Sequence, residues 1–221
     1  MPEYFTASRN RSPEGETGTR LESEFLGEVN KSRYKELVYT LLHKDELDSA
    51  VSPDKKFEIM MKIRDEAQKD FDNILNSAQK GKFINFKNSV RLVEQAQMGN
   101  PEKPSRFFSG ALHNYIKNRF EDKYILKFFT ATGGTHLDIL HGVDGFFKLY
   151  SKESGRELSL ATIDLTKNPT KDRAKADVII YINGNDLEKY DPSRNNSEFD
   201  RNFFNKQVQK FSEEIIKSLV E

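Results

Sequence analysis

Two aspartates stand on either side of a polar turn, at positions where their carboxyl groups could share a cation. Residues 143–150 and 158–166 are rich in β-prone side chains, and a short Gly-containing turn separates them. This pattern predicts a β-hairpin. Asp144 and Asp164 are equally far along the chain from Ser154. A turn centred there therefore places them opposite each other, with Cβ atoms about 4.5–5.5 Å apart.

Two carboxylates at this separation repel each other by roughly a few kcal/mol at an effective dielectric constant of about 20. An otherwise apolar sheet would not tolerate that repulsion, whereas a divalent cation bound between the two groups removes it. A site made of oxygen ligands is suited to Mg²⁺ or Mn²⁺. The sequence therefore predicts a metal site at Asp144 and Asp164. The alternative is that each aspartate ends a strand and faces water.

Alternation along the strands decides which neighbours share the face of these aspartates. Side chains point to opposite faces in turn, so Asp164 and Thr166 share one face while Lys167 points the other way. Lys167 reaches the site only through a bulge or by bending around the strand end. Lys148 shares the face of Asp144 but lies further toward the turn.

Helices are expected to precede the hairpin and to position it. Residues 1–19 are rich in Ser, Gly, Glu, Arg and Pro, and we expect a mobile tail there. Apolar residues at helical spacing predict helices over 21–43, over 53–81 and over 84–98. The second of these has Ser52 as its N-cap, Pro53 as its first residue and an apolar stripe that includes Phe57, Met60 and Met61.

The breaker sequence at residues 99–104 predicts a boundary. A helical N-terminal region then covers residues 20–100, and a mixed α/β domain covers residues 101–221. Within that domain the pattern predicts a long helix over 106–129 and strands over 136–140, 143–150, 158–166 and 178–183. An amphipathic helix over 199–220 is expected to close the chain.

Composition excludes several kinds of site. Cysteine is absent from the 221 residues, which rules out disulfides, thiolate zinc sites and cysteine nucleophiles. The 35 basic and 35 acidic residues balance, which argues against a protein that coats DNA through a broad basic face. The N-terminal segment lacks the apolar stretch of a secretory signal, and no apolar run is long enough to span a bilayer. We therefore expect a cytoplasmic protein without membrane contact.

The acidic residues also resemble a known pattern. A helix with a glutamate, a strand with an aspartate and a second strand with acid-x-Lys resemble the PD-(D/E)XK nuclease superfamily. The resemblance covers roughly residues 106–183, and its motifs are Glu121 in Arg119–Asp122, Asp144 in Gly142–Gly145 and Asp164 in Ile163–Lys167. It implies a restriction-endonuclease-like fold with an α-β-β-β-α-β core. The implied activity is that of a Mg²⁺-dependent hydrolase, an endo- or exonuclease that cleaves phosphodiester bonds of nucleic acid, with DNA as the expected partner.

The resemblance also implies roles for individual residues. Asp144, Asp164 and the carbonyl of Leu165 would hold the metal, with Glu121 bound directly or through water. Lys167 or Lys148 would position the attacking water. The expected contacts to phosphate are Lys148, Lys171, Arg173 and Lys175.

Thr166 is a departure from the family pattern, because it stands where the family's lysine is expected. A catalytically inactive protein that binds nucleic acid or serves in an assembly is therefore the rival interpretation. A third is an interaction protein whose long helices bind the partner. An oligomer is compatible with all three.

Other candidate residues have structural interpretations beside the functional ones. Glu121 is equally suited to a solvated helix surface, and the Lys and Arg residues at 167–175 to a solvated loop. For His136, Asp138 and His141, hydrogen bonding is favoured over joint metal ligation, because three ligands there need a kink at Gly142. Asp138 is retained as a second acid that approaches from the sheet edge.

Overall fold

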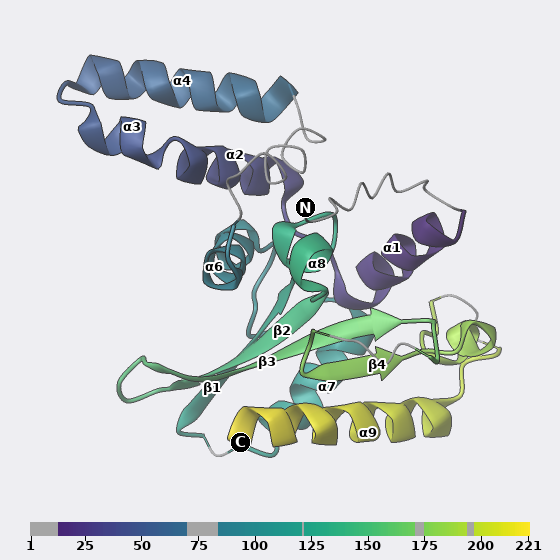
Figure 1. Ribbon diagram of the computed structural model, residues 1–221. Coiled ribbons are helices and arrows are strands. Elements are labelled where there is room, and N and C mark those ends of the chain that lie inside the picture. Colours follow the sequence, from purple (N-terminus) through teal and green to yellow (C-terminus); the bar gives the residue numbers. More distant parts are fainter. Residues whose placement is uncertain (1–12, 70–83, 121, 171–174, 194–196) are drawn as a thin grey trace, which may run out of the picture.

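The centre of the molecule is a four-stranded mixed sheet with strand order β1-β2-β3-β4 (Figure 1). A computed structural model describes residues 13–69, 84–120, 122–170, 175–193 and 197–221. The strands are β1 Tyr124–Thr130, β2 Gly145–Ser151, β3 Glu157–Thr166 and β4 Val178–Tyr181. The first three are antiparallel, and β4 runs parallel to β3. The chain thus has a mixed α+β fold, in agreement with the expected class.

The β2–β3 hairpin has the register that a turn centred near Ser154 requires. Gly145 pairs with Ile163, and the following pairs keep step until an irregularity between Leu149 and Tyr150. The Asp144 N–H donates to the Ile163 carbonyl over 2.9 Å. When this register is continued by one residue, Asp144 lies opposite Asp164, as expected.

The N-terminal helices differ from the expectation at two places. They are α1 Pro13–Leu26, α2 Lys31–Leu42, α3 Lys44–Ser49, α4 Pro53–Lys69 and α6 Phe86–Ala96. The tail prediction is wrong for residues 13–19, which begin α1, while residues 1–12 lie outside the described residues. The single helix over 21–43 is also wrong. The chain turns at Gly27, whose φ of 97° suits glycine, and the Asn30 side chain caps α2 by accepting the Arg33 N–H.

The start of α4 is confirmed, but of the described members of the expected stripe, which also includes Ala67, only Ala67 is buried. The Ser52 hydroxyl accepts the Lys55 N–H over 3.2 Å. α4 packs against α2, and the buried side chains on it are Ile63 and Ala67. The expected stripe residues Phe57, Met60 and Met61 are exposed. The continuation toward Gly81 lies outside the described residues.

The C-terminal half corrects the predicted positions of two elements. Helix α7 spans only Phe107–Lys117, and residues 124–129 of the long helix expected over 106–129 belong to β1, which pairs along its length with β2. The strand expected over 136–140 is helix α8, His136–His141, capped by Thr135 and ended by Gly142 in the left-handed region. The 3₁₀ helix η1, Gly184–Lys189, follows β4. The last helix is confirmed as α9, Arg201–Val220, capped by Asp200.

The element order also departs from an α-β-β-β-α-β core. Helix α8 lies between β1 and β2. No helix joins β3 to β4 in the described residues 167–170 and 175–177. α9 follows the fourth strand instead.

Two apolar clusters cover the two faces of the sheet. The first joins α1, α7 and α9 to strand residues such as Phe147 and Ile163. The second joins α2, α4, α6 and α8 to Phe129 and Phe146, and Figure 1 shows α6 and α8 on the opposite side of the sheet from α9. Each cluster combines residues from before and after 99–104, so that segment does not separate two independent cores. Among the described residues, none of the helices has the length and apolar character needed to cross a membrane.

Candidate metal centre

Asp144 and Asp164 lie buried on the same face of the sheet. Only 5% and 2% of their surfaces are exposed. Side chains alternate along a strand, and Phe146, two residues after Asp144, packs in the cluster formed with α6 and α8. Both aspartates therefore face the α8 side of the sheet.

Helix α8 brings a third carboxylate to this place. The Thr135 hydroxyl accepts the Asp138 N–H over 3.2 Å and starts the helix. The Asp138 carboxylate in turn accepts the Gly134 N–H over 3.2 Å. Asp138 was expected on a strand at the sheet edge, and the structure places it on α8 instead, with a carboxylate oxygen within 4.8 Å of one from Asp144.

Helix α1 brings a fourth carboxylate, from Glu22. Leu21 and Phe25 on either side of it are buried in the first cluster. The hydroxyls of Thr130 and Thr132 donate to the Gly27 carbonyl and hold the end of α1 against the end of β1. Oxygens of Glu22, Asp138 and Asp144 all lie within 4.8 Å of one another.

Sequence reasoning missed Glu22. The helical spacing of Leu21 and Phe25 indicates that the helix packs on something. Nothing in that local pattern says that its neighbour is the start of β2, because the contact joins residues far apart in the chain.

Burial and the neighbouring negative charges together decide whether the carboxyl group of Asp144 is protonated. They raise the pKa of its carboxyl group from 3.8 to about 9, with burial the largest cause, followed by the charges of Glu22, Asp138 and Asp164. The Leu165 N–H, which donates to Asp144 over 2.7 Å, acts in the opposite direction. Asp144 is therefore protonated at neutral pH unless a cation compensates the neighbouring charges.

The donor set fits a hard divalent cation. Glu22, Asp138 and Asp144 offer one carboxylate oxygen each, and oxygen ligands of this kind are those that Mg²⁺ and Mn²⁺ prefer. Asp164 stands beside Asp144 in the hairpin register. This acidic group could thus hold a metal ion, and an ion there would replace the proton on Asp144.

Two other expected residues, Thr166 and Lys167, lie at the end of β3 and directly after it. Thr166 is half-buried, and its hydroxyl accepts the Asn168 N–H over 3.1 Å. Lys167 follows the strand and is half-buried. The carbonyl of Leu165 as a metal ligand stays a prediction.

Lys148 has a different environment from the one expected. Its ammonium lies 2.6 Å from a Glu94 carboxylate oxygen on α6 and 2.7 Å from one of Glu157 on β3. Only 7% of its side chain is exposed. These ion pairs bind Lys148 inside the protein, so the expectation that it contacts nucleic acid or positions water is corrected.

Of the remaining candidates, only Lys175 belongs to the described residues. Lys175 is exposed, and its ammonium donates to the Leu140 carbonyl over 2.8 Å. The expected metal ligand Glu121 and the expected phosphate contacts Lys171 and Arg173 lie outside the described residues.

The two histidines of α8 make structural hydrogen bonds. His136 Nδ1 lies 3.0 Å from the Tyr34 hydroxyl, which also accepts the His136 N–H over 2.9 Å. Burial lowers the pKa of His136 to about 4, so the ring is neutral and Tyr34 donates to it. His141 Nε2 lies 3.3 Å from the Ile84 carbonyl. These contacts agree with the structural interpretation and fix α8, which carries Asp138.

No protein-family model, no curated protein and no solved structure matches this chain. The similarity to the PD-(D/E)XK superfamily accordingly stays a prediction based on short motifs.

Proposed function

We propose that this protein is a divalent-cation-dependent hydrolase that cleaves phosphodiester bonds of nucleic acid, with DNA as the expected substrate. One observation carries the proposal: Glu22, Asp138 and Asp144 bring carboxylate oxygens within 4.8 Å of one another, beside the buried Asp164. Such a concentration of acid at a partly buried place opposes folding. A bound divalent cation would remove that cost.

Mg²⁺ or Mn²⁺ in such a site supplies a bound water of lowered pKa and neutralises charge on a phosphate. The chain's own contribution is to fix the ligands. The Leu165 N–H orients the Asp144 carboxylate, and the Gly134 N–H orients that of Asp138. Lys167 and Thr166, at the end of β3 next to Asp164, are the residues proposed to position water and phosphate.

A second candidate function is binding of nucleic acid without cleavage. Two observations favour it. Thr166 supplies a hydroxyl where the family has an ammonium, and Lys148, the other candidate ammonium, is already paired with Glu94 and Glu157. Metal would then serve to hold α1, α8 and the sheet together.

The test is incubation of the full chain with plasmid, linear and single-stranded DNA, in Mg²⁺, Mn²⁺ or EDTA. Cleavage is expected with either metal and not with EDTA. Asp144→Asn and Asp164→Asn should each reduce it by about 100-fold or more, which corresponds to a loss of about 3 kcal/mol in transition-state stabilisation. Their melting temperatures should not fall. Asp144→Asn spares the folded chain the uptake of a proton at this position, and Asp164→Asn removes a charge that repels Asp144.

Asp177→Asn is the matched control, because Asp177 also lies at the sheet but accepts hydrogen bonds from the N–H and hydroxyl of Thr162. It should leave cleavage unchanged. Cleavage that survives both site substitutions, with a contaminating nuclease excluded, would contradict the proposal. Metal-dependent DNA binding without cleavage would establish the second candidate instead.

A further inference from the structure

Tyr181, the last residue of β4, lies on the face of the sheet that carries the acidic group. β4 runs parallel to β3, and Tyr181 pairs with Thr166. Its chain neighbours Ile180 and Ile182 are buried in the first cluster. Side chains alternate along a strand, so Tyr181 points to the other face, as Asp164 does. With strands about 4.8 Å apart and about 3.3 Å per residue along a strand, the Cα atoms of Tyr181 and Asp164 are about 8 Å apart.

The Tyr181 side chain is not engaged within the fold. It keeps 38% of its surface exposed, although Asp164 on the next strand is buried. Within the described part of the chain, its hydroxyl makes no hydrogen bond and its ring pairs with no other aromatic ring. A tyrosine in this position offers a ligand a flat apolar surface.

The charges around the metal centre do not favour a ligand held by its phosphates alone. The carboxylates of the centre repel phosphate wherever no cation compensates them. The ammonium of Lys148 is paired with two glutamates, and that of Lys175 donates to the Leu140 carbonyl. The chain as a whole has 35 basic and 35 acidic residues. A nucleic acid at this site therefore needs contacts to its bases besides the contact of a phosphate with the metal.

We propose that Tyr181 stacks on an unpaired base of the strand whose phosphate lies at the metal centre, so that the substrate is single-stranded DNA. This inference rests on the proposed function and names its substrate class. An aromatic side chain stacks on any base, which makes the contact independent of sequence. Bases inside a duplex are paired and stacked on each other, and they offer Tyr181 no free face. The short separation from Asp164 suits a base close in the strand to the bound phosphate.

A fluorescent probe at position 181 tests the stacking directly. The chain has no tryptophan, so Tyr181→Trp introduces a single indole. The full-length variant is titrated with oligothymidylate, single-stranded or annealed to oligoadenylate. Ca²⁺, which also takes oxygen ligands, replaces Mg²⁺, and a denaturing gel checks that the strand stays intact. The single strand should quench the indole fluorescence, and the duplex should leave it unchanged.

Two further variants separate the ring from the hydroxyl. Tyr181→Ala should weaken binding of the single strand roughly tenfold or more, as measured by fluorescence anisotropy of a labelled oligothymidylate. Tyr181→Phe keeps the ring and should bind like the wild type.

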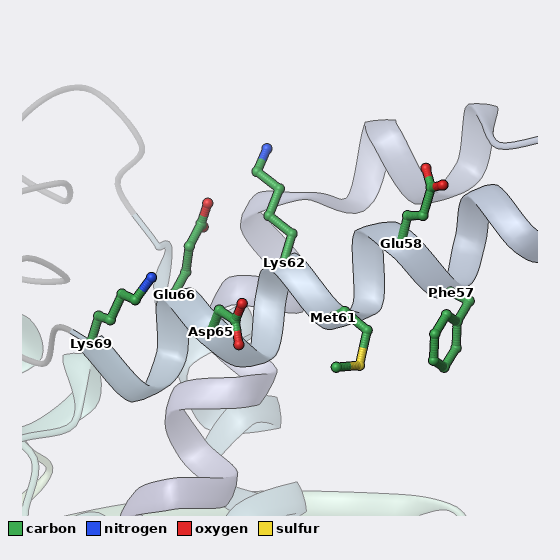
Figure 2. A pocket seen from close by; sticks show the side chains of 7 residues that line it. All are labelled: Phe57, Glu58, Met61, Lys62, Asp65, Glu66 and Lys69. Atoms are coloured by element: carbon green, nitrogen blue, oxygen red, sulfur yellow. The ribbon is translucent and has the colours of Figure 1, made fainter.

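Phe57→Trp is the matched control for the probe. Phe57 is exposed to 66% and projects from α4 (Figure 2), which lies far from the sheet (Figure 1). Neither form of the DNA should quench an indole there. Absence of quenching in Tyr181→Trp, equal quenching by the duplex, or unchanged binding by Tyr181→Ala overturns the stacking.

The stacking and the proposed hydrolase can fail separately. Quenching by the single strand without cleavage in Mg²⁺ or Mn²⁺ would support the stacking and contradict the hydrolase. Metal-dependent cleavage of single-stranded DNA that Tyr181→Ala leaves unchanged would support the hydrolase and overturn the stacking.

Discussion

The proposed site places two opposing demands on Asp144. It must be buried to start β2 beside β3, and it must carry a negative charge to bind a metal. Burial and three neighbouring carboxylates raise its pKa to about 9. The energetic conflict is resolved either by a proton or by a cation, so the charge state of this residue reports on the occupancy of the site.

This conflict predicts how stability depends on pH. In the unfolded chain Asp144 loses its proton near its ordinary pKa of 3.8, whereas the folded protein keeps it to about pH 9. The proton therefore stabilises the metal-free fold most at and below about pH 4, and this contribution is lost as pH rises to about 9. The melting temperature of the metal-free wild type should fall over that range relative to Asp144→Asn, as measured by circular dichroism.

Saturating Mn²⁺ should flatten this difference in pH dependence, because the cation then compensates the ionised carboxylates. Parallel curves for wild type and Asp144→Asn without metal would show that Asp144 titrates normally and that its neighbours do not act on it.

At this scale the sequence predicted part of the acidic group. Asp144 and Asp164 could be paired because hairpin register follows from the position of a local turn. Asp138 was expected to approach them, but from a strand rather than from α8. Glu22 could not be placed beside them, because its approach depends on how α1 packs on the sheet. The environment of Lys148 could not be predicted for the same reason, because its ion-pair partner Glu94 lies on α6.

At the scale of the elements, β1 and α8 differ from what their local sequence pattern predicted. Tyr124 and Phe128 continue the apolar spacing of α7, which favoured a long helix, yet residues 124–130 pair along their whole length with β2. Aromatic side chains suit either structure, and the partner strand decides. α8 is only six residues long, too short for its periodicity to distinguish a helix from a strand. Strong end signals, such as Ser52 before α4, were read correctly.

The ion pairs that tie α6 to the sheet predict the outcome of Lys148→Met. Removing the ammonium leaves the carboxylates of Glu94 and Glu157 facing each other. We expect a loss of about 2–3 kcal/mol in the free energy of unfolding, less than for a fully buried pair, because both glutamates keep some exposure. Urea denaturation measures it.

The control is Lys152→Met in the exposed turn, which should change stability by less than about 0.5 kcal/mol. DNA binding should be the same in both variants. A stable Lys148→Met protein with weakened DNA binding would restore the role that the sequence suggested for Lys148.

At the scale of the whole molecule, the described residues form two apolar clusters, and neither is confined to one part of the chain. Leu21, Phe25 and Leu26 of α1 complete the first. Residues of α2, α4 and α6 make up much of the second. The proposed site depends on the same arrangement, since Glu22 comes from α1 and Asp144 from the sheet.

A chain cut to residues 101–221 should therefore not fold stably. It lacks the α1 side chains of the first cluster and most of the second, and each fully buried Leu or Phe contributes about 1.5–3 kcal/mol. We expect a non-cooperative thermal transition by circular dichroism, where the full chain unfolds cooperatively. A truncated chain that melts cooperatively and cleaves DNA would show that the N-terminal helices are a separate appendage and that Glu22 is dispensable.

The central claim, a divalent cation held by carboxylates from α1, α8 and the β2–β3 hairpin, is tested most directly by anomalous diffraction from a crystal soaked in Mn²⁺. The expected result is a peak bounded by Glu22, Asp138 and Asp144, which is lost in Asp144→Asn crystals. A well-occupied peak elsewhere, or none at a Mn²⁺ concentration that supports cleavage, would contradict the claim.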